Sequence, residues 1–259
     1  MDRRLTLALL AAQAAAFWPV WSWYARRMLD PSDEPWGALA LVTLAALSFA
    51  TSSRGSARSF TAPAALTAAY AAAYPWLPPL ARLMLALAAC AATLATLTGG
   101  RPLHPSRLAL AALATPLLPT LQFVAGYPLR VAAGELAALM LRASGLPVAR
   151  EGVLLALGDA VVQVDAPCSG VRMLWAGLFL AAVVSWRLRA SASAACLAAA
   201  AVAVVLANAL RAAALFLPEA GLVRVPAFVH EAVGLVVFAL VAALVALLAR
   251  RMEGQACAA

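Results

Sequence analysis

Three short polar stretches interrupt the apolar C-terminal part of this sequence. The first, residues 165–172, reads DAPCSGVR and places the thiol of Cys168 just before a long apolar run. The second contains Asn208 and Arg211, and the third contains His230. Ionisable side chains are costly within membrane-spanning segments and are by default candidates for function. These side chains are therefore the first candidates for a functional site.

Together the three stretches offer a nucleophile, a proton carrier and a fixed cation. Cys168 precedes a predicted helix and has arginines nearby, and both features favour the thiolate, which is the nucleophilic form. His230 could take a proton from Cys168 and return one to a leaving amine. Arg211 keeps its charge and offers a fork of donors for an oxyanion or a carboxylate. Asn208 and Arg172 are candidates for supporting roles.

The residues beside Cys168 set it apart from the other cysteines. It follows a proline and precedes Ser169 and Gly170 at a predicted membrane edge, so these two residues also count as candidates for supporting roles. A cysteine inside a membrane helix is more often a small packing residue. We expect that role for Cys90 and Cys196, which fall within apolar runs.

Two further polar residues have plainer interpretations. Asp165 could orient His230, although capping the following helix is the more common role of an Asp in such a place. His104 stands in an Arg-containing loop, where we expect it to be solvated. The four cysteines and two histidines show no CxxC or other metal-ligand spacing, so we predict neither a metal nor a cofactor.

The composition is typical of a polytopic α-helical membrane protein. Of the 259 residues 65% are hydrophobic and 12% are charged, and the mean hydropathy is +0.92, which is too apolar for a soluble domain. The net charge of +8 comes with arginines that punctuate apolar runs singly or in pairs, as topology signals do, so we expect no nucleic-acid binding. The predicted fold class is all-α, as a single membrane domain over residues 1–259.

Eight apolar runs are long enough to cross the hydrocarbon core, which takes about 20 helical residues. They divide the domain into N-terminal helices over 5–125, an extracytoplasmic loop over 126–168 and the helices of the candidate site over 169–250. A Pro-rich turn at 75–79 separates two of the spans, and a chain of seven spans remains the alternative. The predicted spans are 5–24, 35–51, 61–78, 80–98, 107–125, 169–186, 192–217 and 228–249.

The placement of arginines predicts that both termini are cytoplasmic. The short loops expected inside carry Arg54, Arg101 and Arg187 among others, as the positive-inside rule requires. The first 24 residues have features of a secretory signal peptide, but their aromatic end suits a membrane interface, so we expect an uncleaved first span. In this orientation Cys168 lies at an outer end of a span.

The other candidates are predicted to meet Cys168 near the outer surface. The seventh span ends outside near Leu217, which places Arg211 about 9 Å deeper, at about 1.5 Å per residue. Asn208 follows one turn deeper on the same helix face. His230 falls in the first turn of the last span.

The long loop contains two predicted elements. Residues 129–143 could form an interfacial helix. Residues 153–157 and 160–164 flank Gly158-Asp159, and such a two-residue turn between apolar runs is a signal for a β-hairpin. The hairpin would bring residues 165–168 to the membrane surface, and its edge could pair with an extended substrate strand.

The three stretches, together with Gly234 four residues after His230, resemble the exosortase/archaeosortase family of integral-membrane cysteine transpeptidases. The resemblance covers about residues 160–240. It implies that Cys168, Arg211 and His230 are catalytic, and the histidine in the third position is similar to the bacterial exosortase branch rather than the archaeal one.

The resemblance also implies a substrate class and a compartment. Such enzymes act at the outer face of the cytoplasmic membrane on exported proteins with a C-terminal sorting signal, made of a short motif such as Pro-Glu-Pro, a transmembrane helix and an Arg-rich end. Cys168 would attack near the motif and form a thioester, which water or an amine resolves. The partners expected are exported proteins, membrane lipids and a surface glycan or lipid acceptor.

Two functions from other classes compete with this one. A solute transporter could bind its cargo through Arg211, Asn208 and His230, although the broken mid-membrane helices and paired acids typical of transporters are not evident in the sequence. A noncatalytic scaffold for the export of surface polysaccharide or protein would have no need of Cys168. Replacing Cys168 by Ser or Ala therefore separates the enzyme from both alternatives.

Overall fold

The computed structural model describes residues 3–30, 35–51, 60–99, 101, 103–165, 169–226 and 228–257. Of the described residues 76% are helical, and they form ten helices and one small sheet. By its internal contacts it divides into two compact units. The first contains Met1–Leu117 and Ser185–Ala194, and the second contains Leu118–Val184 and Ala195–Ala259.

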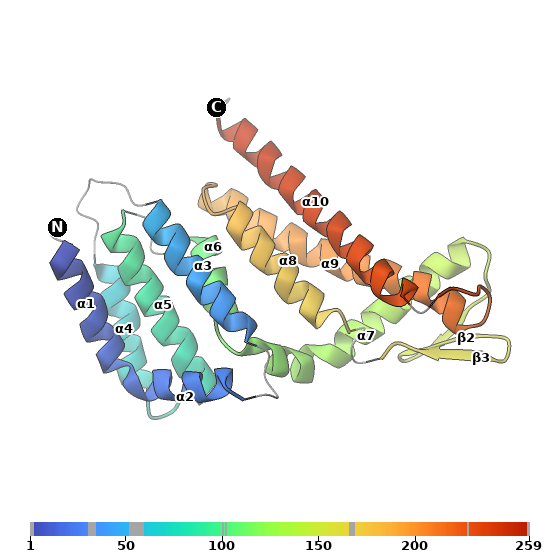
Figure 1. The fold of residues 1–259 in the computed structure, drawn as a ribbon, viewed down its shortest axis with the longest axis horizontal. Helices are drawn as coiled ribbons and strands as arrows, with labels where there is room; N and C mark the ends of the chain where they lie inside the picture. Colours follow the sequence, from blue (N-terminus) through green and yellow to red (C-terminus); the bar gives the residue numbers. More distant parts are fainter. Residues whose placement is uncertain are drawn as a thin grey trace. The chain divides into compact units, whose positions relative to one another are not determined.

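The first unit is a bundle of helices that pack around α5. Helix α4 runs beside α5, α1 and α2 also contact α5, and α3 packs against α6 (Figure 1). The turn between α4 and α5 lies at the Pro-rich stretch 75–79, as predicted, and α5 starts with a proline, which is well suited to a first helical turn. The helices are α1 (Arg3–Ala16), α2 (Trp18–Met28), α3 (Trp36–Ala50), α4 (Thr61–Ala73), α5 (Pro79–Leu97) and α6 (Pro105–Leu113).

The second unit combines long helices with a three-stranded sheet. Helix α8 packs against α10 (Figure 1). Helix α9 enters this unit after Ala194, since its first residues belong to the first unit. The elements are α7 (Leu117–Ala143), β1 (Ala149–Glu151), β2 (Leu154–Leu157), β3 (Ala160–Gln163), α8 (Val171–Val184), α9 (Ala190–Glu219) and α10 (Val229–Cys257).

The predicted hairpin is confirmed, and a third strand joins it. β2 and β3 pair antiparallel from Leu157 opposite Ala160 to Leu154 opposite Gln163, and Gly158 in the turn has a φ of +60°. β1 pairs with the other side of β2, so that β2 is central and β3 lies at an edge of the sheet.

One face of the sheet is anchored by a hydrophobic core within the second unit. Leu155 at the centre of β2 is only 1% exposed. It packs in a cluster with side chains from α7 and α9, including Leu141 and the fully buried Phe216. On the opposite face, Val161 of β3 is 62% exposed. The hairpin is therefore held against the helices by one side only.

Two predicted spans are not continuous helices. The predicted helix over 107–125 is broken at residues 114–116, where α6 ends and α7 begins, because Pro116 supplies no N–H and restricts the residue before it. The first predicted span is broken at Phe17, just before Pro19 in the first turn of α2. Helix α7 continues to Ala143, so the predicted interfacial helix over 129–143 is the second half of a longer helix.

Four of the described helices are long and apolar enough to cross a membrane: α5, α7, α9 and α10. Helices α3 and α8 are apolar but shorter. The chain is thus a helical membrane protein, as the composition predicted. The count of eight spans stays a prediction.

Candidate functional site

The nucleophile proposed from the sequence, Cys168, lies outside the described residues, as do the two residues before it. The residues on either side of this gap are described. Asp165 ends the segment that follows β3 and is exposed, and Arg172 is exposed in the first turn of α8. Ser169 and Gly170 lie between the gap and α8 and are buried.

Ser169 and Gly170 start helix α8 in a fixed geometry. The Leu174 N–H donates to the Gly170 carbonyl oxygen at 2.8 Å. Gly170 has a φ of +80°, which a residue with a β-carbon rarely adopts. Ser169 is only 3% exposed, and its hydroxyl donates to Gln122 Oε1 of α7 at 3.0 Å. The backbone directly after Cys168 is therefore fixed to α7.

Asn208 of α9 closes the other side of this segment. Its side chain is 3% exposed, and a β-carbon built on Gly170 would come within 2.8 Å of Asn208 Cγ. Residues 169, 170 and 208 line a cavity of about 10 Å³, which is at most the space of one water molecule. This gap is too small for a peptide, and the Asn208 side chain packs directly against Gly170.

Arg211, one turn along α9 from Asn208, reaches His230 of α10. Arg211 Nη2 lies 3.5 Å from His230 Nε2, at the long limit for a hydrogen bond. Because a guanidinium can only donate, this contact requires Nε2 to be the acceptor nitrogen of a neutral imidazole, with the proton on Nδ1. The predicted meeting of these two side chains is thus found in the second unit.

The other imidazole nitrogen faces a carboxylate that the sequence did not single out. Glu219, in the last turn of α9, places Oε1 3.7 Å from His230 Nδ1. Both side chains remain accessible, at 42% for Glu219 and 48% for His230. A carboxylate at Nδ1 favours the tautomer with its proton on Nδ1, which is the tautomer that the contact of Nε2 with Arg211 requires.

Gly234 gives Arg211 room to lie against α10. A β-carbon at residue 234 would come within 3.3 Å of Arg211 Nε, closer than a comfortable contact. That Nε is buried and has no hydrogen-bond partner among the described residues. The guanidinium is therefore packed on one edge, and its Nη2 edge is turned towards His230.

The arrangement can position a proton carrier and a cation at one accessible point. Among the described residues, no group of three or more His, Cys, Asp or Glu side chains could hold a metal ion. The chemistry offered here is that of an imidazole and a guanidinium acting on a polar reactant.

A family model described as a transmembrane exosortase (Exosortase_EpsH) matches residues 5–247. The chain belongs to this family. The match extends the resemblance seen around residues 160–240 to nearly the whole chain, and its description agrees with a membrane protein. No curated protein and no solved structure matches it significantly.

Two contacts of the candidate site escape sequence reasoning. Gln122, the acceptor for Ser169, lies within an apolar stretch of α7 far along the chain, and nothing in the local pattern connects it to residue 169. Glu219 was within reach of prediction, because it is an acidic residue at the C-terminal end of the helix that carries Arg211. Glu219 and His230 lie on opposite sides of the connection between α9 and α10, so the sequence does not show that their side chains meet.

Proposed function

We propose that this protein is a membrane cysteine transpeptidase that cleaves the C-terminal sorting signal of exported proteins and transfers or releases them outside the cytoplasmic membrane. The single observation that carries the proposal is the contact between Arg211 and His230. Membership of the exosortase family supplies the class of reaction.

In the proposed reaction Cys168 is the nucleophile. Its thiolate attacks the carbonyl carbon of the scissile peptide bond, and Arg211 stabilises the oxyanion that forms. His230, having taken the thiol proton on Nε2, gives a proton to the leaving amine, which departs with the transmembrane tail of the substrate. Water or an acceptor amine then attacks the thioester, loses its proton to the imidazole and regenerates the thiolate.

The geometry around residues 169–170 supports this assignment of Cys168. The segment that directly follows the cysteine packs on Asn208, and Asn208 is one turn from Arg211 on the same helix. Helix α8 also begins at this segment, so its positive end favours an anionic sulfur. Asp165 and Arg172 remain candidates for supporting roles at the two sides of the cysteine.

The edge of the sheet offers a place for the extended part of a sorting signal. β3 pairs only with β2 among the described residues, and it is the strand that leads along the chain to Cys168. A substrate motif added beside β3 would gain main-chain hydrogen bonds and reach the cysteine. In the topology that we propose, with eight spans and both termini cytoplasmic, this edge faces the extracytoplasmic side.

The decisive experiment is co-expression with a tagged exported protein that ends in a Pro-Glu-Pro-type motif, an apolar helix and arginines. Wild-type protein should remove the tail, and mass spectrometry should detect a thioester to the substrate on Cys168. Cys168→Ala should abolish cleavage in a protein that still folds and inserts. Cys90→Ala, a matched change at a cysteine inside α5, should leave cleavage intact.

The same experiment separates the competing functions. A scaffold or a solute carrier would keep its activity in Cys168→Ala cells, and that result would remove the peptidase proposal. Arg211→Lys adds a second criterion, because lysine keeps the charge but loses the planar fork. Full cleavage by Arg211→Lys would show that the positive charge is sufficient and that the planar fork is not required.

A further inference from the structure

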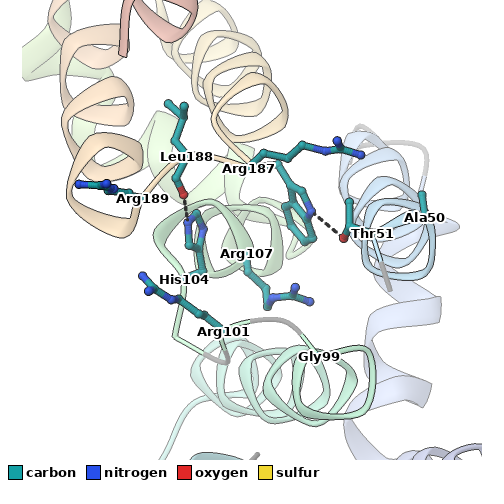
Figure 2. Close-up of a pocket in the computed structure, with 10 residues that line it drawn as sticks. Ala50, Thr51, Gly99, Arg101, His104, Arg107, Arg187, Leu188 and Arg189 are labelled. Atoms are coloured by element: carbon teal, nitrogen blue, oxygen red, sulfur yellow. Dashed lines mark hydrogen bonds between the residues drawn. The ribbon is translucent and has the colours of Figure 1, made fainter. Parts of the chain in front are cut away.

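A second, strongly basic pocket lies wholly within the first unit. It has a volume of about 620 Å³ and opens between the end of α3, the connection from α5 to α6 and the connection from α8 to α9 (Figure 2). Its ten described lining residues include four arginines and one histidine and no acid. They are Ala50, Thr51, Gly99, Arg101, His104, Arg107, Trp186, Arg187, Leu188 and Arg189.

Arg107 is the most deeply buried of these cations, so its charge costs the most free energy to remove from water. Its residue is only 4% exposed, its Nη1 donates to the Ser48 hydroxyl at 2.7 Å, and its guanidinium lies 4.5 Å from the ring centre of Trp186. The buried Nε has no hydrogen-bond partner among the described residues. A buried cation held only by neutral groups is expensive unless an anion is nearby.

The walls of the pocket are fixed by hydrogen bonds to distant parts of the chain. His104 Nε2 lies 2.9 Å from the Leu188 carbonyl oxygen, and the indole N–H of Trp186 donates to the Thr51 hydroxyl at 3.2 Å. His104 is therefore buried, at 8% exposed, and the prediction of a solvated loop histidine is wrong. The lining is held in place by contacts across the unit, so the site is largely preformed.

Next to these lining residues in the sequence, three serines form hydrogen bonds that link α6 to the α8–α9 connection and to α9. The hydroxyl of Ser106 lies 2.6 Å from that of Ser193 and 3.0 Å from that of Ser185. All three residues are fully buried. This cluster keeps two walls of the pocket at a constant separation.

The backbone adds to the positive potential. Helices α6 and α9 both begin at the pocket, directly after His104 and Arg189, and neither has an acidic residue in its first turn. Helix N-termini present free N–H groups to anions. In the sequence, residues 50–61, 98–108 and 185–195 contain no Asp or Glu. The cations of the pocket thus find no carboxylate along the segments that form it.

We infer that this pocket binds a phosphate group, supplied by the headgroup of an anionic phospholipid. The three segments around it are all predicted to lie on the cytoplasmic side, where anionic headgroups are within reach of basic pockets between helices. Arginine forks match phosphate oxygens in geometry. The Arg-rich end of a sorting signal is excluded as an occupant, because it carries the same charge as the pocket.

The test uses full-length protein in nanodiscs of phosphatidylcholine with or without phosphatidylglycerol, and native mass spectrometry to count retained lipids. Wild-type protein should retain phosphatidylglycerol in preference to phosphatidylcholine. Arg187→Gln with Arg189→Gln removes two exposed cations from the lining and should weaken that retention about tenfold or more. Arg250→Gln with Arg251→Gln, a matched exposed pair near the end of α10, should leave it unchanged.

A second arm replaces lipid by inorganic phosphate and follows the thermal unfolding temperature. If phosphate stabilises the wild type but not the Arg187/Arg189 variant while neither protein prefers phosphatidylglycerol, that result supports the phosphate site and assigns it to a soluble anion. Equal behaviour of the two double variants in both arms, or no binding of either ligand by the wild type, overturns the inference. Arg101→Gln, an exposed change from another wall, repeats the test if the first variant folds poorly.

Discussion

Gly170 lies so close to Asn208 that a β-carbon on the glycine would stand 2.8 Å from Asn208 Cγ and 2.9 Å from its Nδ2. The start of α8 thus packs so closely on the Asn208 side chain of α9 that only glycine fits at residue 170. The proposed nucleophile, Cys168, comes two residues before Gly170 in the sequence.

Gly170→Ala should therefore destabilise the protein and abolish cleavage. The left-handed backbone costs about 1–2 kcal/mol for any residue with a β-carbon, and the overlap with Asn208 adds about 1–3 kcal/mol. Gly145→Ala is the matched control, since Gly145 has a φ of +91° and nothing within 4 Å of its missing β-carbon. Thermal unfolding in detergent and the cleavage assay should separate the two variants. Equal losses in both would assign the whole effect to backbone strain.

Gly234→Ala should raise the stability of the protein slightly and lower its activity. Alanine is a better helix former than glycine by about 1 kcal/mol, so α10 should become slightly more stable. The added β-carbon would crowd Arg211 Nε at 3.3 Å and displace the guanidinium from His230, which should lower the cleavage rate. Gly134→Ala in α7 meets no atom closer than 3.8 Å and should keep full activity. An unimpaired Gly234→Ala enzyme would mean that the position of Arg211 is not critical.

Glu219→Gln should slow cleavage about fivefold, which corresponds to the loss of an exposed ion pair of up to about 1 kcal/mol. The amide removes the negative charge beside His230 Nδ1, so the imidazolium formed during the reaction loses support. The readout is the cleavage rate at saturating substrate, compared with that of the wild type. Glu231→Gln removes an exposed charge next to His230 in the sequence and serves as the control. A larger effect of Glu231→Gln than of Glu219→Gln would contradict the pairing.

Leu155→Ala should loosen the sheet and reduce cleavage of the sorting signal. Removing a leucine that is 1% exposed and packed near Phe216 should cost about 2–5 kcal/mol. Hydrogen exchange of residues 154–163 should accelerate, because the sheet loses its anchor on α7 and α9. Val161→Ala, on the exposed face of the same hairpin, should change neither exchange nor cleavage. Unchanged cleavage by a loosened Leu155→Ala hairpin would argue that the sheet does not hold the substrate.

Features coded locally were predicted from the sequence. The hairpin followed from Gly158-Asp159 between apolar runs, and the turn before α5 followed from its prolines. The meeting of Arg211 with His230 followed from helix geometry, because each residue had a known depth below the end of its span. Hydropathy alone overlooked the break at Pro116, since apolar residues flank the proline on both sides, although the proline itself carried the signal.

Features that depend on distant partners were not predicted. The burial of His104 depends on the Leu188 carbonyl, and the hydrogen bond of Ser169 depends on Gln122 in another helix. A backbone carbonyl is present at every position, so nothing in the sequence marks that of Leu188. Gln122 is a polar residue in an apolar helix, but its spacing does not connect it to Ser169. The basic pocket was likewise hidden, because its arginines were interpreted one by one as orientation signals rather than as one lining.

Helix α9 carries four residues with tertiary contacts. Asn208 meets the start of α8, Phe216 packs in the core beneath the sheet, and Arg211 and Glu219 meet the two nitrogens of the His230 ring. One extra residue between Arg211 and Phe216 would rotate the following residues of α9, up to Glu219, by about 100° and advance them by about 1.5 Å. Phe216 and Glu219 would then lose their neighbours while Asn208 and Arg211 kept theirs. The rotational position of these residues around the helix therefore constrains the sequence of α9 more than hydrophobicity does. Insertions and deletions among relatives should fall in the connection after Glu219.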